Sequence, residues 1–303
     1  MRASRRIQND NSSRSVVPRI LRIVTYAILS LWSLVCLFPI YWLAVTSIKG
    51  AADVDQAGNF LPFLNFEPSL DAWRFILTTP SENLVSRFIN SLIIGSVSTV
   101  LTLIIACLAI YAVTRSSNIA TRADGQKFLI FILCTRLLPP TVLALPVFMM
   151  LNTVGLLDTR TALVFVYSAI NLPVAIWLLQ PAFGNKATEI EEAAHLDGAS
   201  QFAILFTILL PTLRSALVAT GLLLFILCWN EYVFAVYLTS DNALTLPPWL
   251  VGQLSMKEAQ TGGGPEEVAQ LSAAATFMII PLIVFATIAL RPIGKAAVWQ
   301  ANR

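Results

Sequence analysis

The chain has 303 residues, of which 56% are hydrophobic and only 12% are charged, and its mean hydropathy is +0.73. Soluble domains carry about 25% charged residues, so this composition excludes an ordinary soluble domain and favours one polytopic membrane domain. The net charge of +3 is too small to indicate a nucleic-acid partner.

Cysteine and histidine usage predicts neither a disulfide framework nor a metal site. All four cysteines, Cys36, Cys107, Cys134 and Cys228, fall inside apolar runs, where a free cysteine behaves as a small buried hydrophobe. His195 is the only histidine. We therefore expect no metal centre in this chain.

The amino-terminal segment, residues 1–20, is polar and rich in arginine, and we expect a disordered cytoplasmic tail. The apolar run at about 21–48 is too long for the hydrophobic region of a signal peptide, so it predicts a full membrane-crossing helix. The following segment, 49–87, contains an amphipathic stretch around 70–77. An ordered connector and an irregular linker are both open interpretations of that segment.

Five further apolar runs each approach the ~20 residues that a helix needs to cross the bilayer core. Together with the first run they predict an all-α integral membrane protein with six transmembrane helices. Residues 21–293 would form this transmembrane domain, and 294–303 a cytoplasmic tail. The five further spans are predicted at about 88–113, 128–151, 161–183, 213–238 and 271–290.

The charges of the loops predict the orientation of the spans. Both tails are basic, and the loop at 114–127 carries three basic residues against one acidic residue. The segments 49–87 and 239–270 are net acidic. The positive-inside rule therefore places both termini and the 114–127 loop in the cytoplasm. The loop at 184–211 must then be cytoplasmic as well, although its first half is acidic.

That loop begins with a short predicted helix. Thr188, followed three residues later by Glu191, forms a capping-box pattern that predicts a helix start. Gly198 predicts a left-handed turn that ends the helix. The helix would have about nine residues, below the roughly 12–15 needed for marginal stability alone in water. It therefore needs a surface to pack against, and the small Ala193 and Ala194 would let another protein approach its backbone.

The same loop carries a recognisable motif. The letters EAA at 192–194 are followed at fixed spacing by Gly198, by Ile208 and by LP at 210–211. This pattern resembles the EAA motif in the membrane subunits of binding-protein-dependent ABC importers. The resemblance implies a cytoplasmic coupling helix that docks on an ATPase subunit. The residues expected to dock are Glu192, Ala193, Ala194, Asp197 and Gly198.

The chain carries no motif for hydrolysing ATP. A P-loop requires GxxxxGK[ST], whose backbone amides cradle phosphate, and this pattern is absent. The patterns GxSxG and HExxH are absent too. We therefore expect a transport subunit without cofactors of its own, powered by a partner.

Several polar residues fall inside the predicted spans. Arg136 lies in the third span, where a charge costs at least ~2.5–3.5 kcal/mol unless it faces protein or water. Asn230 and Glu231 lie in the fifth span beside Trp229, and Asn171 precedes a proline in the fourth. These five residues are candidates for the translocation path or gate. Alternatively, Glu231 pairs with Arg136 and holds the bundle together, and Asn171 marks a kink.

Four further stretches extend the resemblance to the MalG-type branch, the permeases for carbohydrates. They are GLLDT at 155–159, NLPVAIW at 171–177, WNE at 229–231 and TLP at 245–247. The resemblance implies an ABC type I importer permease fold. It also implies a second, MalF-like permease, two ATPase subunits that bind ATP and Mg, and a periplasmic or lipid-anchored solute-binding protein. The carboxyl terminus, IGKAAVWQANR, departs from the GLTAGAVKG-like tail that is frequent in the family.

A glycine-rich loop lies before the sixth span, at Gly262, Gly263, Gly264 and Pro265. In related permeases a loop here reaches into the binding protein, and the resemblance implies the same contact. A slack linker is the alternative.

The expected function is therefore import of a sugar, polyol or glycoside by a multi-pass protein of the bacterial inner membrane. An ABC permease for a non-carbohydrate solute is the first alternative. An ion-gradient-driven secondary transporter is the second, and it predicts paired carboxylates near mid-membrane. Glu231 is the only acidic residue deep in a span, which disfavours the second alternative.

Overall fold

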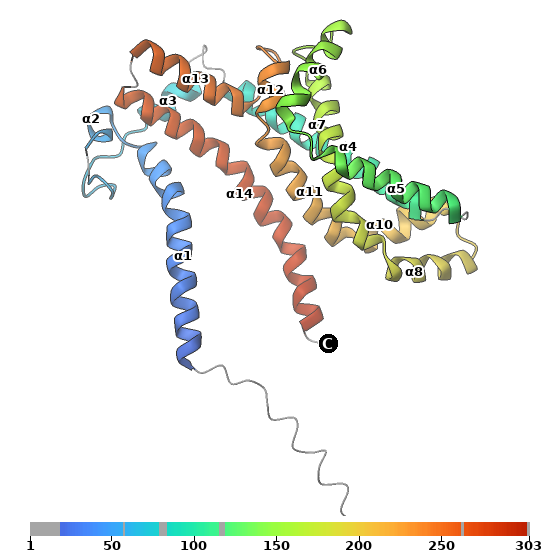
Figure 1. The fold of residues 1–303 in the computed structure, drawn as a ribbon. Helices are drawn as coiled ribbons and strands as arrows, with labels where there is room; N and C mark the ends of the chain where they lie inside the picture. The colour runs from blue at the N-terminus through green and yellow to red at the C-terminus, as the bar shows by residue number, and fades with distance from the viewer. Residues whose placement is uncertain (1–18, 57, 79–83, 115–118, 262–263, 302–303) are drawn as a thin grey trace, which may run out of the picture.

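Helices make up nearly all of the regular structure (Figure 1). The computed structural model describes residues 19–56, 58–78, 84–114, 119–261 and 264–301. Within these ranges the only β-type pairing is an isolated bridge between Pro62 and Phe66. The prediction of an all-α protein is confirmed.

Among the described residues, four helices are long and apolar enough to cross a membrane unaided. Their spanning parts contain 23 to 31 residues, which covers the ~20 that a bilayer core requires. The four are α1 (Arg19–Thr46), α4 (Leu84–Thr114), α7 (Arg160–Leu179, continued by the 3-10 turn η1, Gln180–Phe183) and α14 (Pro265–Ala301).

Two bent pairs complete the set of up to six spans. The first pair, α5 (Ile119–Thr135) and α6 (Pro140–Thr153), is bent by 99° where Pro139 and Pro140 cannot donate helical hydrogen bonds. The second pair is bent by 76°. It comprises α9 (Gln201–Ala203), the π-helix η2 (Ile204–Leu209) and α10 (Leu210–Thr212) on one side and α11 (Arg214–Trp229) on the other.

These breaks correct two predicted spans. The third span, expected as one run at 128–151, turns sharply between α5 and α6. The fifth, expected at 213–238, stops at Trp229 and resumes as α12 (Val233–Leu238) after a three-residue interruption at 230–232. Apolar runs identify membrane segments by length and composition, and neither property reports a bend.

The helices α4, α7 and α11 pack on one another at the centre of the bundle. Small residues let membrane helices approach closely. A Cβ atom added to Gly95 would lie 3.3 Å from the ring of Phe225 on α11, so this glycine sets the approach of the two helices. The buried face of α4 carries further small or polar residues: Ser91, Ser98, Thr99, Thr102 and Ala106.

The short helices gather at the two ends of the bundle. At one end, called here the α13 end, lie α2 (Ala51–Val54), α3 (Asp71–Thr78) and α13 (Leu246–Thr261) (Figure 1). At the opposite end, called here the α8 end, lies α8 (Asn185–Leu196). The amphipathic stretch expected around 70–77 is confirmed by α3, which buries Ala72 and Ile76.

Helix α1 stands apart from the central helices and approaches α14 (Figure 1). None of its membrane window is buried within the chain. The segment just after α1 is buried, by contrast. Lys49 is only 2% exposed, and its Nζ lies 4.8 Å from the centre of the Trp42 ring. Burial lowers the pKa of Lys49, and the charge of Asp53 opposes this in part.

Candidate functional site

Helix α8 is the short helix that the EAA-like stretch predicts, with corrected limits. It has 12 residues and starts after Gly184, so Thr188 lies inside its first turns and the predicted capping box is wrong. Gly184 at the boundary has no side chain to cap with, and the helix runs on from it. The turn η1 lies directly before Gly184, so the chain is already helical there and α8 begins earlier than the capping pattern predicts. Helix ends are the least certain part of an assignment from local patterns.

The end of α8 is confirmed as predicted. Gly198 has a φ of +83°, and its amide donates to the carbonyl of His195. The next amide, of Ala199, donates to the carbonyl of Ala194 at 3.0 Å. These bonds satisfy terminal carbonyls in the manner of a glycine C-cap. The left-handed backbone turns the chain directly into Ser200, whose hydroxyl caps the next helix by accepting from the amide of Ala203.

The two motif alanines of α8, Ala193 and Ala194, differ in their burial. Ala194 is buried, together with Glu191 three residues before it, because α8 packs against η1 and η2 on that side. Ala193 is exposed, as is Asp197. The backbone of Glu192 belongs to α8, and its side chain lies outside what the structure describes. Of the five residues expected to dock, Ala194 therefore faces the bundle, and Ala193, Asp197 and Gly198 are open.

Two large apolar side chains beside this turn were not predicted. Leu196 is 90% exposed and Phe202 is 77% exposed. Contiguous exposed apolar surface commonly marks a protein–protein contact, and these two residues lie six positions apart in the chain, on either side of the glycine turn. Sequence reasoning missed them because it read the motif by its small and acidic positions. The available signal was that both apolar residues flank a glycine turn in a polar loop.

At the other end of the bundle, Asp158 anchors a distant loop. Its carboxylate accepts hydrogen bonds from the backbone amides of Ser240, Asp241, Asn242 and Ala243 at 2.9–3.3 Å. Burial acts to raise the pKa of Asp158, but the backbone hydrogen bonds outweigh it and lower the pKa to about 2. We call this carboxylate and the loop it holds, residues 240–243, the Asp158 anchor.

Helix α4 also holds the loop of the anchor, through Arg87 and Asn90. The guanidinium of Arg87 contacts both the carboxylate and the carbonyl of Asp241. Asn90 donates to the carbonyls of Asn242 and Leu244, each at 2.9 Å. Arg160 in turn donates to the side-chain oxygen of Asn90 at 2.7 Å. Asp158 of GLLDT is thus brought to the loop just before TLP, a contact that sequence reasoning missed because the separation along the chain is large.

The WNE stretch begins at the last residue of α11 and continues into the interruption before α12. Trp229 is only 1% exposed, packs against Phe88 and Phe225, and donates to the carbonyl of Met278 at 3.1 Å. Asn230 is exposed and donates back to Ile226. Trp229 is therefore a core residue in this structure, whereas Asn230 is open.

Glu231 lies two residues before the first residue of α12 and caps the amino-terminal end of that helix. Its two carboxylate oxygens accept from the amides of Phe234 at 2.9 Å and Ala235 at 3.1 Å. A carboxylate at this position satisfies amides that have no partner inside the helix and complements the positive helix end. The side chain is half-buried beside Tyr167.

Arg136 and Glu231, both within the described part of the chain, form no ion pair with each other. Arg136 lies at the bend between α5 and α6, is exposed, and donates to the carbonyl of Ile170 at 3.3 Å. Asn171 is 2% exposed and donates to the carbonyl of Tyr167 and to the sulfur of Cys228, so it links α7 to α11. Asn171 thus lies beside Cys228, the residue before Trp229, whereas Arg136 and Glu231 are not paired in the described chain.

The glycine-rich loop is described only in part. Gly262 and Gly263 lie outside the described residues. Gly264 follows them, and its amide donates to the side chain of Glu267 at 3.3 Å. Pro265 is the first residue of α14, a position that suits proline because its missing amide hydrogen needs no partner there.

The membrane-crossing helices and the helix α8 between them define a polytopic membrane permease. Residues 125–296 match the family described as "Binding-protein-dependent transport system inner membrane component". The chain belongs to this family. It is therefore a multi-pass transport subunit of the inner membrane and not an enzyme.

Individual relatives cover most of the chain. It is 33% identical over 272 residues to the trehalose/maltose transport system permease protein MalG of Thermococcus litoralis, spanning 89% of this chain and 92% of that protein. It is 29% identical over 256 residues to the trehalose transport system permease protein SugB of Mycobacterium tuberculosis, spanning 83% and 87%.

A solved structure supports the fold. A chain of a bacterial ABC transporter involved in the import of the acidic polysaccharide alginate superposes with a TM-score of 0.71. The match covers 91% of this chain and 98% of the other, at 23% identity. At that identity the likeness shows the fold, and it agrees with the expected importer permease architecture.

Proposed function

We propose that this chain is one of two permease subunits of an ATP-driven importer for a sugar, polyol or glycoside. The observation that carries the proposal is helix α8. It is a short helix that ends at a glycine turn and exposes Leu196 at its last residue, and Phe202 of α9 is exposed just after the turn. The carbohydrate class is supported by the relatives named for trehalose and maltose.

The proposed partners follow from the family. A second, MalF-like permease would complete the path across the membrane, and two ATPase subunits would bind ATP and Mg. A periplasmic or lipid-anchored binding protein would deliver the solute, and Gly262–Pro265 would contact it. Both termini and α8 would lie in the cytoplasm, as the loop charges indicate. This orientation puts the Asp158 anchor on the outer side.

The proposed mechanism uses α8 as a lever. Helix α8 packs on η2, and η2 continues through α10 into α11. Closure of the ATPase dimer on ATP would therefore displace the bend between α10 and α11 and reorient the bundle. ATP and the loaded binding protein must favour one of the two states differentially for this to drive transport. Arg136, Asn230 and Glu231 are proposed to face or gate the solute path, with Trp229 and Asn171 supporting it from within the bundle.

The first prediction tests docking through Leu196. This side chain is almost fully exposed, so Leu196→Ser should leave the fold intact and remove one apolar contact to the ATPase. We expect about tenfold weaker ATPase binding, equivalent to about 1.4 kcal/mol, within the range for an exposed leucine buried at an interface. Binding is measured by titrating ATPase subunits onto the permease pair in lipid nanodiscs.

A matched control is Leu64→Ser, because Leu64 is 81% exposed and lies in the connector after α1. It should leave ATPase binding at the wild-type level. Equal binding by wild type and Leu196→Ser would contradict the proposal that α8 is the docking element.

In the same nanodiscs, ATP hydrolysis that rises with a binding protein loaded with trehalose or maltose supports a carbohydrate importer. Transport without ATP would instead support an ion-driven carrier.

A further inference from the structure

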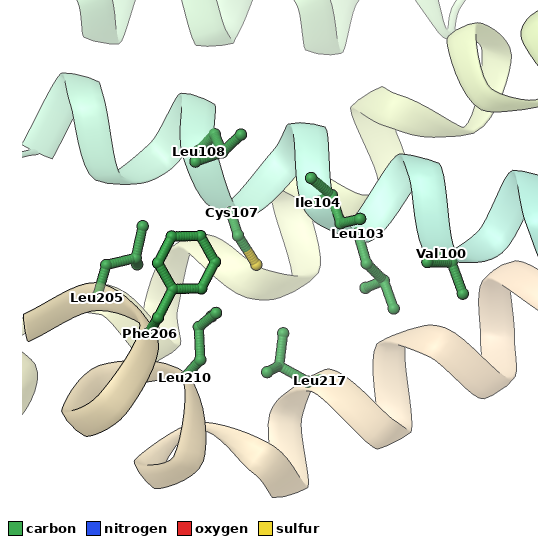
Figure 2. Close-up of a pocket in the computed structure, with 9 residues that line it drawn as sticks. All are labelled: Val100, Leu103, Ile104, Cys107, Leu108, Leu205, Phe206, Leu210 and Leu217. Carbon is green, nitrogen blue, oxygen red and sulfur yellow. The ribbon is translucent and has the colours of Figure 1, made fainter. Parts of the chain in front are cut away.

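A pocket of about 230 Å³ lies in the angle between α10 and α11, where α4 crosses the bent pair (Figure 2). Leu103, Ile104 and Cys107 line it from α4. Phe206 of η2 and Leu217 of α11 close it from the other side. The pocket exists because the chain turns by 76° at this point instead of continuing as one straight helix against α4.

The lining determines what the pocket can hold. Every lining side chain is apolar, and the thiol of Cys107 is the only side-chain heteroatom among them. Apolar cavities as large as about 150 Å³ stay free of water and accept apolar ligands. A solute rich in hydroxyl groups would lose hydrogen bonds to water here and gain none. The occupant must therefore be hydrocarbon.

The mouth of the pocket opens on one face of α4. Val100 and Ile104 at the mouth are 55% and 51% exposed, and the same face continues to Leu108 and back to Val97 and Ile93. This face consists of large aliphatic residues. Helix–helix contacts in membranes favour small and polar residues, which α4 carries on its buried face instead. The composition of the mouth therefore fits lipid better than another helix.

A cation stands beside the apolar lining. Arg214 is the first residue of α11, one helical turn before Leu217, and the two therefore share a side of the helix. Arg214 is exposed and has no ion-pair partner among the described residues. Its side chain can extend toward the membrane surface, as arginines near the ends of membrane helices do. A phosphate group at that surface would complement it.

We propose that a phospholipid from the leaflet on the α8 side inserts one acyl chain into this pocket and places its phosphate at Arg214. The acyl chain then fills the angle between α10 and α11 and contacts η2, on which α8 packs. The lipid thus supports the segment that links α8 to the central helices. This occupancy does not depend on which solute the chain transports.

The test uses the assembled transporter in vesicles that contain phosphatidylglycerol with a diazirine on its acyl chain. After illumination, labelled peptides are identified by mass spectrometry. We expect label on the peptides that cover 100–108 and 205–217. Leu217→Trp fills the pocket and should lose this label, and Cys107→Phe is a second filling variant. Ile89→Trp is the matched control, because Ile89 is 42% exposed on α4 away from the pocket, and it should keep the label.

Arg214→Gln tests the headgroup separately. It should keep the acyl label but lower the preference for phosphatidylglycerol over phosphatidylethanolamine about fivefold, the effect of about 1 kcal/mol for one arginine at an anionic surface. Label that persists in both filling variants overturns the proposal. So does an Ile104→Cys variant that cross-links to the partner permease, because a protein side chain would then occupy the mouth. Each variant is first shown to assemble by co-elution with its partners.

Discussion

At the scale of single residues, Asp158 has the most defined electrostatic role in the described chain. Its φ of +55° is left-handed, a conformation that Asp and Asn adopt more readily than other non-glycine residues. Its single carboxylate takes the place of water as the hydrogen-bond acceptor for four consecutive backbone amides. The sequence marks this residue within GLLDT but does not reveal its partners, because they belong to a loop more than 80 residues away.

Asp158→Asn is expected to lower the stability of the assembled permease by about 1–2 kcal/mol at neutral pH. Asn keeps the shape and the backbone preference, but its NH2 group replaces one of the two acceptor oxygens. The loss therefore comes from the charge and from the hydrogen bonds that this oxygen accepts, and solvent screening reduces the charge contribution. The pKa of Asp158 is lowered from 3.8 to about 2, so its contribution is complete above about pH 4 and is lost as pH falls toward 2.

Thermal unfolding at pH 8 and pH 5 measures this effect. The difference between wild type and Asp158→Asn should be the same at both values. A difference that shrinks between pH 8 and pH 5 would contradict the assignment. Asp71→Asn is the control, since the exposed carboxylate of Asp71 makes only local contacts, lying 4.0 Å from Arg74 and accepting a hydrogen bond from the hydroxyl of Ser69, and the substitution should be nearly neutral.

At the scale of elements, the interruption after α11 shows what local patterns predict and what they miss. The membrane segments were predicted because hydrophobicity over about 20 residues is a strong signal. The end at Gly198 was predicted because glycine favours a left-handed turn. The start of α8, the bend at Pro139 and the π-helix η2 depend on packing between elements. The polar neighbours of Trp229 predict a place on the path, yet its ring packs inward against Phe88 and Phe225.

Glu231→Ala is expected to loosen α12 without unfolding the bundle. Two amides lose their carboxylate acceptor, which for a helix cap costs about 1 kcal/mol. Hydrogen exchange at Phe234 and Ala235 should accelerate about fivefold, the factor for about 1 kcal/mol of local opening. Asn230→Ala serves as the control, because Asn230 bonds only within its own helix turn. Unchanged exchange at both amides in Glu231→Ala would refute the capping role.

At the scale of the whole molecule, the chain has more exposed apolar surface than its own helices can cover. Helix α1 buries none of its membrane window against the rest of the chain. Large exposed side chains continue along α5 and α6, among them Phe131, Val142 and Met150. Lipid can solvate some of this surface, and the proposed second permease would cover the rest. Composition predicts such a surface but not which part belongs to the partner.

The partner permease is expected to raise the unfolding temperature of this chain. A subunit that binds only the folded state stabilises it by about 2.7 kcal/mol at one hundred times its dissociation constant. Fluorescence-detected size exclusion after heating compares the chain alone with the co-expressed pair. Identical melting of the two samples would mean that the exposed helices face lipid alone. A mutation on the exposed face of α4, away from α1, α5 and α6, is Ile89→Ala, and it should leave the increment from the partner unchanged.

The hydrogen bonds of the Asp158 anchor can form only late in the synthesis of the chain. The chain is made from its amino terminus, and Ser240 follows Asp158 by 82 residues. At a synthesis rate of about 5–20 residues per second, about 4 to 16 seconds pass between the synthesis of Asp158 and that of its amide donors. During that interval α6 and α7 have been made without the loop that fastens them. Until residues 240–243 are made, the partly synthesised bundle therefore lacks the hydrogen bonds of the Asp158 anchor.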